Sequence, residues 1–138
     1  MQINYWAVLV CGIVSMVIGM LWYGPIFGKK WMEITGMTKM SKEEQERMKK
    51  SSNVLYLVTF ILALFQAMVL AFYIVGWKDA SGVENSLWIW GAFMIPVVAA
   101  GAMWNGDAKA NAWARFWINA GYYLVQMVVF GLILGMWR

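Results

Sequence analysis

The sequence predicts an all-α membrane protein with four transmembrane helices, arranged as two tandem helical hairpins in a single membrane domain, 1–138. Composition is the first observation, since 62% of the residues are hydrophobic and 13% are charged, about half the charged share of soluble domains. The second is that the apolar residues form four uncharged runs, each near the roughly 20 residues that cross a bilayer as a helix. An internal similarity between the two halves is the third. We place the transmembrane helices at 5–23, 54–77, 86–104 and 115–137.

The first transmembrane helix ends at a Gly-Pro pair. Pro25 lacks an amide donor and disfavours helical backbone at Gly24, so the helix should break there. Because Pro is well tolerated in a first turn, a new helix is expected over residues 25–35. In this stretch apolar side chains alternate with Lys29 and Lys30 in an amphipathic pattern, typical of a helix in the headgroup layer.

A charged segment follows Gly36, where the interfacial helix should end. Ser41 and Glu44 have the spacing of a capping box, which predicts a helix start. We expect a charged cytoplasmic helix at 41–53 that leads into the second transmembrane helix. It is interpreted as a solvated stem, and a docking surface for a partner is the alternative.

The second hairpin begins after the polar linker 78–86. Pro96 lies near the middle of the third transmembrane helix and predicts a kink there. The polar stretch 105–111 is short enough for a turn between helices, and Gly106 is a candidate helix break.

Charge placement predicts the orientation of the chain in the membrane. Nine of the eleven Lys and Arg residues lie in the first and third connections or at their helix edges. The positive-inside rule therefore makes these connections cytoplasmic and puts both termini outside, as in an inner-membrane protein of a bacterium. A nucleic-acid partner is disfavoured, because glutamates interleave with the basic residues.

The internal similarity has two parts. A shift of 82 residues superposes Trp6 on Trp88, Gly19 on Gly101, Trp22 on Trp104, Gly24 on Gly106 and Trp31 on Trp113. A shift of 60 residues superposes Thr59 on Asn119, Gln66 on Gln126 and Trp77 on Trp137. The two shifts differ because the charged stretch 32–53 is an insertion in the first copy. These matches predict a parallel repeat about an axis along the membrane normal. The alternative is that Trp and Gly simply recur at helix ends.

Two further patterns predict how the helices contact lipid and one another. Tryptophan concentrates near helix ends, as in membrane-interface belts; the candidate anchors are Trp6, Trp22, Trp31, Trp77, Trp88, Trp104, Trp113 and Trp137. Small residues at four-residue spacing allow close helix packing; they are Cys11, Ser15, Gly19, Ala63, Ala67, Ala71, Gly131 and Gly135. The partner helix can belong to the same chain or to a second copy.

Polar side chains within the transmembrane helices are the candidate functional residues. They fall on one face of each of the second and fourth helices: Thr59, Gln66, Arg115, Asn119, Tyr122 and Gln126. The repeat predicts that Thr59 approaches Asn119 and that Gln66 approaches Gln126. They are interpreted as interhelical hydrogen bonds, and a polar path for a small solute is the alternative. Arg115 can also anchor its helix by reaching lipid phosphate.

Several classes of function are disfavoured by the residues. The chain has no histidine and one cysteine, Cys11, which argues against histidine-ligated metals, haem and histidine-based catalysis. Proton-coupled transport usually needs a carboxylate in the membrane, and the four apolar runs contain none. We therefore expect no catalytic residues, no bound metal and no cofactor.

The stretch "LWYGPIFGKKW" at residues 21–31 is the most distinctive in the chain. Together with the opening residues and the later "RFWINAGYYLVQMVVFGLILGMW", it resembles the bacterial membrane-protein family catalogued as domain of unknown function 1761. The resemblance covers essentially the whole chain. It implies a small integral membrane protein, and it implies no activity and no functional residue.

Three hypotheses of function remain. The first is a non-enzymatic membrane protein that forms a homo-oligomer or serves as an accessory subunit of a larger membrane complex. The second is a channel or facilitator with a polar path between the second and fourth helices. The third is a protein that binds anionic membrane lipids; its candidate headgroup ligands are Lys29, Lys30 and Arg115.

Overall fold

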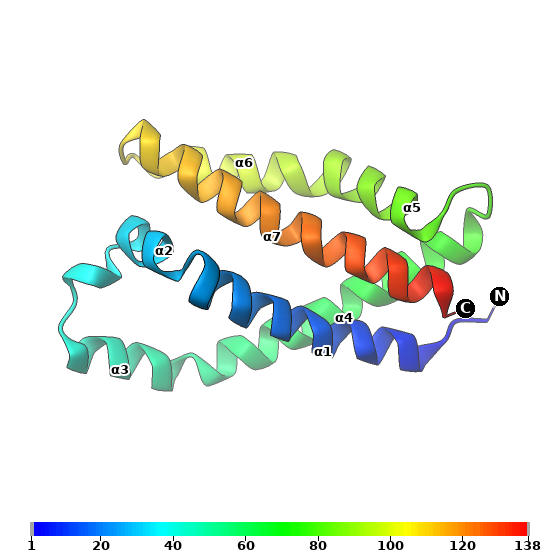
Figure 1. Cartoon of the computed structure of the whole chain (residues 1–138), viewed down its shortest axis with the longest axis horizontal. Coiled ribbons are helices and arrows are strands. Elements are labelled where there is room, and N and C mark those ends of the chain that lie inside the picture. The colour runs from blue at the N-terminus through cyan, green and yellow to red at the C-terminus, as the bar shows by residue number, and fades with distance from the viewer. Residues whose placement is uncertain (1, 138) are drawn as a thin grey trace.

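Four long helical rods lie side by side in the computed structural model, which describes residues 2–137 (Figure 1). Each rod is long and apolar enough to cross a membrane, and no strand occurs in the described range. The rods comprise Tyr5–Ile26, Asn53–Gly76, Gly82–Met103 and Lys109–Met136. The fold is therefore all-helical, with four helices that could each cross a membrane, as the apolar runs predict.

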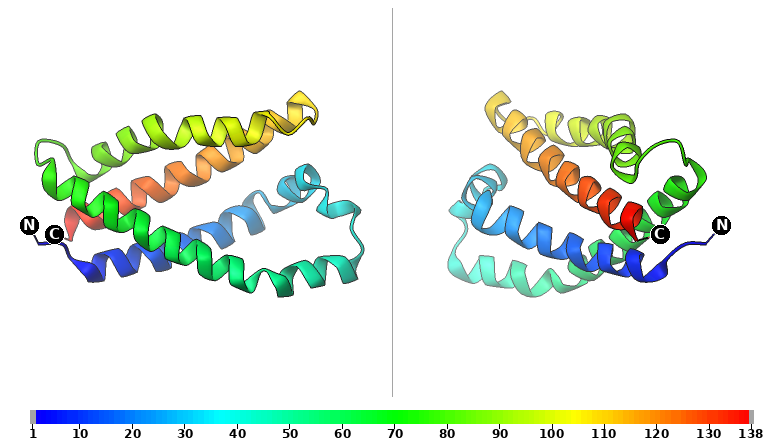
Figure 2. Two further views of the ribbon diagram at one scale, coloured as in Figure 1. Left: turned by 180° about the vertical axis from the view of Figure 1, so that it is seen from behind. Right: turned by 45° about the vertical axis from the view of Figure 1, so that its right-hand side comes forward.

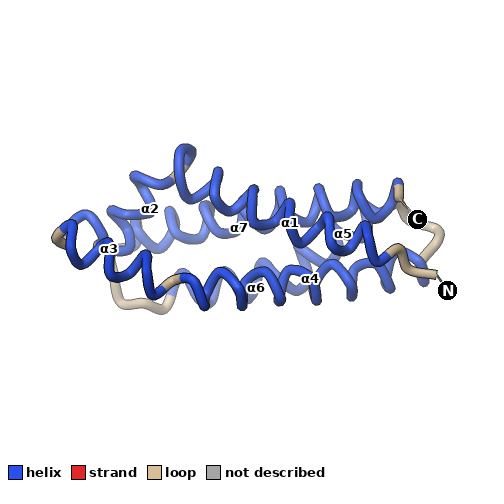
Figure 3. Tube along the Cα trace, turned by 90° about the horizontal axis from the view of Figure 1, so that it is seen from below, coloured by secondary structure: helices blue, strands red, loops and turns tan. Residues whose placement is uncertain are grey.

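The elements follow one another with short connections and are nearly all α-helical (Figure 3). In chain order they are α1 (Tyr5–Leu21), η1 (Trp22–Ile26), α2 (Gly28–Thr35), η2 (Met37–Lys39), α3 (Lys42–Ser51), α4 (Asn53–Gly76), α5 (Gly82–Ile89), η3 (Trp90–Met94), α6 (Ile95–Met103) and α7 (Lys109–Met136). Two of them, η1 and η3, are single π-helical turns beside the two prolines.

The first π turn explains where the interfacial helix begins. Pro25 lies inside η1, and the carbonyl of Trp22 accepts a bond from the amide of Phe27 at 2.9 Å, five residues on. The chain is therefore still turning at residue 25, and α2 starts at Gly28 rather than at the proline. A Cβ atom at Gly28 would lie 3.0 Å from the carbonyl oxygen of Tyr23. A glycine at this position lets the turn close tightly.

The stretch between α2 and α4 contains the signals expected from its sequence. Gly36 ends α2 in the left-handed conformation, with φ of 77°. Ser41 and Glu44 form both bonds of a capping box at the start of α3. Helix α3 does not run directly into α4, because the backbone of Ser52 leaves regular helix between them.

The second hairpin contains longer helices than its apolar runs indicate. Helix α5 begins at Gly82, because the hydroxyl of Ser81 caps it by accepting from the Glu84 amide at 3.1 Å. The π turn η3 ends two residues before Pro96, where the sequence predicts a kink. A turn with Gly106 at φ of 73° then leads to α7, whose first turns are polar and extend beyond the apolar run.

Helix α7 occupies the centre of the bundle, as the three ribbon views together show (Figure 2). It contacts α5 and α6 on one side and α1 on the other, and it crosses α4. Helix α1 packs closely on α4 through small buried residues. The start of α1, the end of α7 and the 77–81 loop lie at one end, here the terminal end. Helices α2 and α3 and the 104–108 turn lie at the other, here the basic end (Figure 1).

Candidate functional site

Two glutamines meet where α4 crosses α7. The side-chain amide of Gln126 donates a hydrogen bond to the Oε1 atom of Gln66 at 2.5 Å. Gln126 is 3% exposed and Gln66 is half-buried. In a membrane, an amide pair of this kind contributes about 0.6–2 kcal/mol to helix association. The structure thus brings together the two residues that the 60-residue shift superposes.

The other superposed pair, Thr59 and Asn119, is not a pair in the structure, and that prediction is wrong. Asn119 Oδ1 accepts a hydrogen bond from the hydroxyl of Tyr23 at 2.6 Å. Thr59 donates to the carbonyl of Leu55 in its own helix at 2.8 Å. The physical reason is the crossing of α4 and α7 at the glutamines: two turns away, near the basic end, Tyr23 of the first rod supplies the partner of Asn119.

Aromatic rings surround the Tyr23–Asn119 bond. The ring centroid of Tyr23 lies 4.9 Å from that of Trp31 and 5.4 Å from that of Tyr122. Tyr122 also contacts Tyr123, at 5.0 Å between centroids. Such tilted and edge-on contacts favour rigid packing. The cluster fixes the η1 elbow and α2 against α7.

A groove of about 660 Å³ lies beside this cluster, between α1, α4 and α7. It is here called the tyrosine groove, and it is lined by Ser15, Met16, Gly19, Met20, Tyr23, Gly24, Tyr56, Thr59, Tyr122 and Tyr123. Its polar groups are hydroxyls, and several of them already have partners. Ser15 donates to the Gly12 carbonyl at 2.7 Å, and Tyr122 lies 3.5 Å from the Ser15 carbonyl oxygen.

The polar side chains that line the tyrosine groove are suited to hydrogen bonding. No carboxylate, amine or histidine lines the tyrosine groove. Within residues 2–137, no three His, Cys, Asp or Glu side chains gather as a metal site would require. The polar side chains at these sites each have a hydrogen-bond partner within the protein: Gln66 pairs with Gln126, Tyr23 with Asn119, and Thr59 with a carbonyl of its own helix. They therefore stabilise the bundle at separate points and do not form one continuous row of free polar groups.

Arg115 holds together the connection between α6 and α7. Its Nη2 atom lies 2.7 Å from Asp107 Oδ2, and its Nη1 atom donates to the carbonyl of Ala102 at 3.2 Å. The guanidinium thus joins the end of α6, the turn and α7. Its hydrogen bond holds the pKa of Asp107 below the ordinary value. Lys29 and Lys30 are exposed on α2, and Lys30 lies 3.8 Å from Glu33.

The predicted tryptophan anchors separate into two groups. Trp22 is half-buried against α7: its indole nitrogen donates to the carbonyl of Ile118 at 2.9 Å, and its ring covers Gly121. It packs there because the π turn directs it onto α7. Trp31 is half-buried in the aromatic cluster. The remaining six are exposed: Trp6, Trp77, Trp88, Trp104, Trp113 and Trp137.

The small residues pack helices of the same chain against one another. Ala63, Ala67 and Ala71 of α4 are buried against Cys11 of α1 and its neighbours. Gly131 and Gly135 of α7 lie against Gly82 of α5, and Gly19 lies against the ring of Tyr122. These faces are therefore occupied within the chain.

Some of the positioning residues were missed in the sequence. Trp90, in η3, donates its indole N–H to the carbonyl of Ala120 at 3.1 Å. This carbonyl is two residues along α7 from the Ile118 carbonyl that accepts from Trp22. The local sequence gives no signal for Tyr23, because its partner Asn119 lies 96 residues away along the chain. Gly82 and Asn85 fall in a stretch interpreted as a linker, although Ser81 and Glu84 have the spacing of a helix start.

Fold and site together define the class of the protein. It has four helices suited to a membrane, internally paired polar groups in them, and charged residues gathered at its ends. Within this class, the chain belongs to the family described as "Protein of unknown function (DUF1761)", whose family model matches residues 6–135. This confirms the resemblance found in the sequence. No curated protein and no solved structure matches the chain.

Proposed function

We propose that this protein is a non-enzymatic subunit of the membrane that assembles with further copies of itself. One observation carries the proposal: α4 presents a row of large apolar side chains outward, at the spacing of a helix-pairing seam. This row, here the α4 seam, consists of Val58, Leu62, Phe65, Val69 and Phe72, which are 45–68% exposed.

The spacing of the α4 seam supports a helix partner. Its members follow one another at alternating four- and three-residue steps, so that Val58, Phe65 and Phe72 repeat every seven residues. This is the repeat that two helices need to keep one face in mutual contact. The small-residue faces are occupied inside the bundle and are not available to a second copy. The α4 seam is therefore the surface through which copies assemble.

The state of the polar residues supports a subunit over a channel. Gln66 and Gln126 are bonded to each other, and Asn119 is bonded to Tyr23. A path would need such groups free to face water or solute. Their pairing inside the bundle leaves apolar side chains as the main outward feature of the transmembrane helices.

The orientation and the repeat belong to the same proposal. The basic end faces the cytoplasm, because the positive-inside rule places Lys- and Arg-rich connections there. The two hairpins descend from one repeated unit, and the meeting of Gln66 with Gln126 supports this, since equivalent positions of a two-fold repeat meet at its axis. Trp22 and Trp104 no longer share an environment, because Trp104 is 88% exposed.

Disulfide formation between single cysteines tests the assembly. The only native cysteine, Cys11, is fully buried, so it can be replaced by Ala to give a silent background. In native membranes, Phe65→Cys and Phe72→Cys should each form a disulfide-linked dimer on mild oxidation, because paired Cα atoms within about 7 Å can bridge. Val97→Cys on α6 is the matched control, at 71% exposure.

A dimer from both α4 positions and none from Val97→Cys supports the proposal. No cross-link at either α4 position, or equal cross-linking at Val97→Cys, contradicts it. Native mass spectrometry of Gln66→Leu/Gln126→Leu then separates the two roles of the glutamines. The subunit proposal expects a less stable chain, whereas a stable chain with altered ion or solute flux in liposomes favours a channel.

A further inference from the structure

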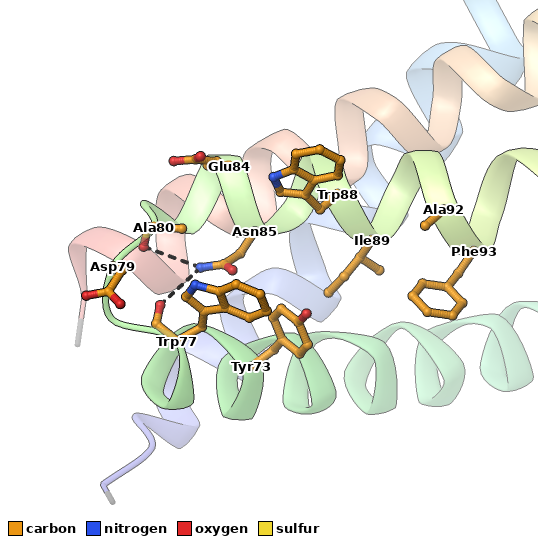
Figure 4. Close-up of a pocket in the computed structure, with 10 residues that line it drawn as sticks. All are labelled: Tyr73, Trp77, Asp79, Ala80, Glu84, Asn85, Trp88, Ile89, Ala92 and Phe93. Atoms are coloured by element: carbon orange, nitrogen blue, oxygen red, sulfur yellow. Dashed lines mark hydrogen bonds between the residues drawn. The ribbon is translucent and has the colours of Figure 1, made fainter.

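A second cavity, apart from the tyrosine groove, opens between α4 and α5 at the terminal end (Figure 4). Its volume is about 510 Å³, within the range of roughly 300–1,000 Å³ usual for small-molecule sites. Aromatic side chains from both sides line it: Tyr73 and Trp77 from the end of α4, and Trp88 and Phe93 from α5 and η3. It is here called the α4–α5 cavity.

Two carboxylates lie at the loop end of this cavity. Asp79 belongs to the 77–81 loop, and Glu84 belongs to the first turn of α5. Neither makes an ion pair with any residue in the range 2–137. The neighbouring Lys78 does not line the cavity. The two charged residues that line the cavity are therefore both negative.

Asn85, a buried residue, turns a hydrogen-bond acceptor toward the same cavity. Its side chain is 2% exposed, and its Nδ2 atom donates to the carbonyls of Ser81 at 3.1 Å and Ala80 at 3.3 Å. These carbonyls fix the orientation of the amide, because an oxygen cannot face them. Its Oδ1 atom accepts no bond from the part of the chain that the structure describes. Figure 4 shows this oxygen on the side of the Trp77 and Tyr73 rings.

An amide oxygen that faces a cavity without a protein partner can accept a hydrogen bond from a ligand or from water. The partner that fits is a group with N–H donors and a positive charge. Aromatic faces attract cations, and carboxylates add to that attraction. A quaternary ammonium lacks the N–H that Asn85 requires, and an anion is disfavoured by Asp79 and Glu84.

We propose that the α4–α5 cavity binds a primary ammonium group carried on an apolar body. The ammonium donates to Asn85 Oδ1 and lies between the aromatic rings and the two carboxylates. The apolar body extends along Ile89 and Phe93 toward the middle of the membrane. Phe93 is 71% exposed, so this side of the cavity is open laterally. The headgroup of phosphatidylethanolamine and a free long-chain amine both have this chemistry.

Native mass spectrometry of the full chain in mild detergent measures the binding. The lipid arm compares phosphatidylethanolamine, phosphatidylcholine and phosphatidylglycerol with identical acyl chains, and the free-amine arm compares decylamine with decanol. Asp79→Asn/Glu84→Gln should weaken binding of the ammonium ligand about fivefold, at roughly 0.5 kcal/mol for each exposed charge. Glu43→Gln/Glu46→Gln makes the same charge change on α3 and should leave binding unaltered.

A second pair of variants tests the aromatic wall. Trp88→Leu should weaken ammonium binding about threefold through loss of its cation–π contact. Trp104→Leu is the matched control, since both indoles are exposed and Trp104 lies at the other end. Both tryptophans can be replaced without opening the bundle core.

The outcomes separate the two sources of the ligand. Preference for phosphatidylethanolamine over both other lipids, lost in the Asp79/Glu84 variant only, assigns the site to a lipid headgroup. Preference for decylamine over decanol with the same variant dependence, and no lipid preference, assigns it to a free amine. Equal binding of all compounds, or equal loss in both carboxylate variants, overturns the proposal. None of these results depends on whether the chain self-assembles.

Discussion

The close backbone contact between α5 and α7 leads to a prediction about Gly82. A Cβ atom at this position would lie 2.2 Å from the carbonyl oxygen of Gly131 and 3.0 Å from the Cα atom of Gly135. Carbon and oxygen atoms in such contacts normally lie about 3.3–3.6 Å apart. Gly82→Ala must therefore push α5 away from α7 by roughly 1 Å. Backbone atoms form the obstacle, so no side chain can rotate to make room.

The expected cost follows from that displacement. Overpacking of a closely packed contact costs about 1–3 kcal/mol, and the better helix propensity of Ala returns at most about 1 kcal/mol. We expect Gly82→Ala to lower the free energy of unfolding by about 2 kcal/mol. Gly101→Ala is the matched control, because a Cβ atom at Gly101 meets nothing within 4 Å. It should leave stability unchanged or slightly increased.

The stability of both variants can be measured by unfolding in mixed micelles. Far-UV circular dichroism follows the loss of helix as the fraction of denaturing detergent rises. A shift of the midpoint for Gly82→Ala alone agrees with the geometry. If Gly82→Ala unfolds at the same detergent fraction as Gly101→Ala, then α5 and α7 do not approach through glycine, and the reasoning fails.

Three other substitutions have defined outcomes in the same unfolding assay. The bond from Arg115 lowers the pKa of Asp107 in the folded chain. The stabilisation of the fold by the ionised Asp107 is therefore complete above the unfolded pKa of 3.8 and disappears as the pH falls below it. Asp107→Asn should remove this acid dependence of stability. Trp22→Phe loses an indole hydrogen bond to α7 and should cost about 1 kcal/mol, whereas Trp104→Phe, at an 88% exposed site, should cost nothing measurable. Gly36→Ala forces a side chain into positive φ and should cost about 1 kcal/mol, and equal stability would contradict the left-handed end of α2.

The features that the sequence predicted well are those with local causes. Length and apolarity alone require the four long helices, because backbone in lipid must bond within its own segment. The capping box at Ser41 and the glycine end at Gly36 depend on residues within one or two turns. The meeting of Gln66 with Gln126 was accessible through the internal similarity, which relates residues far apart in the chain.

The features that the sequence did not reveal depend on how the helices cross. Trp22 and Trp90 donate to backbone carbonyls, and a carbonyl acceptor has no signature in a sequence. Asn119 has a polar partner, but only the crossing of the rods decides between Tyr23 and Thr59. The small residues showed that helices approach closely; they did not show which helices.

The central position of α7 has a consequence for biosynthesis. Each of the three earlier rods places a polar side chain on α7: Tyr23 on Asn119, Gln66 on Gln126, and the indole of Trp90 on a backbone carbonyl. Chains emerge from the ribosome N-terminus first, so these groups are synthesised before their partners on α7. The first three rods are thus incomplete until the fourth is translated. A chain halted before α7 would therefore keep Tyr23, Gln66 and Trp90 without the partners that they have in the finished bundle.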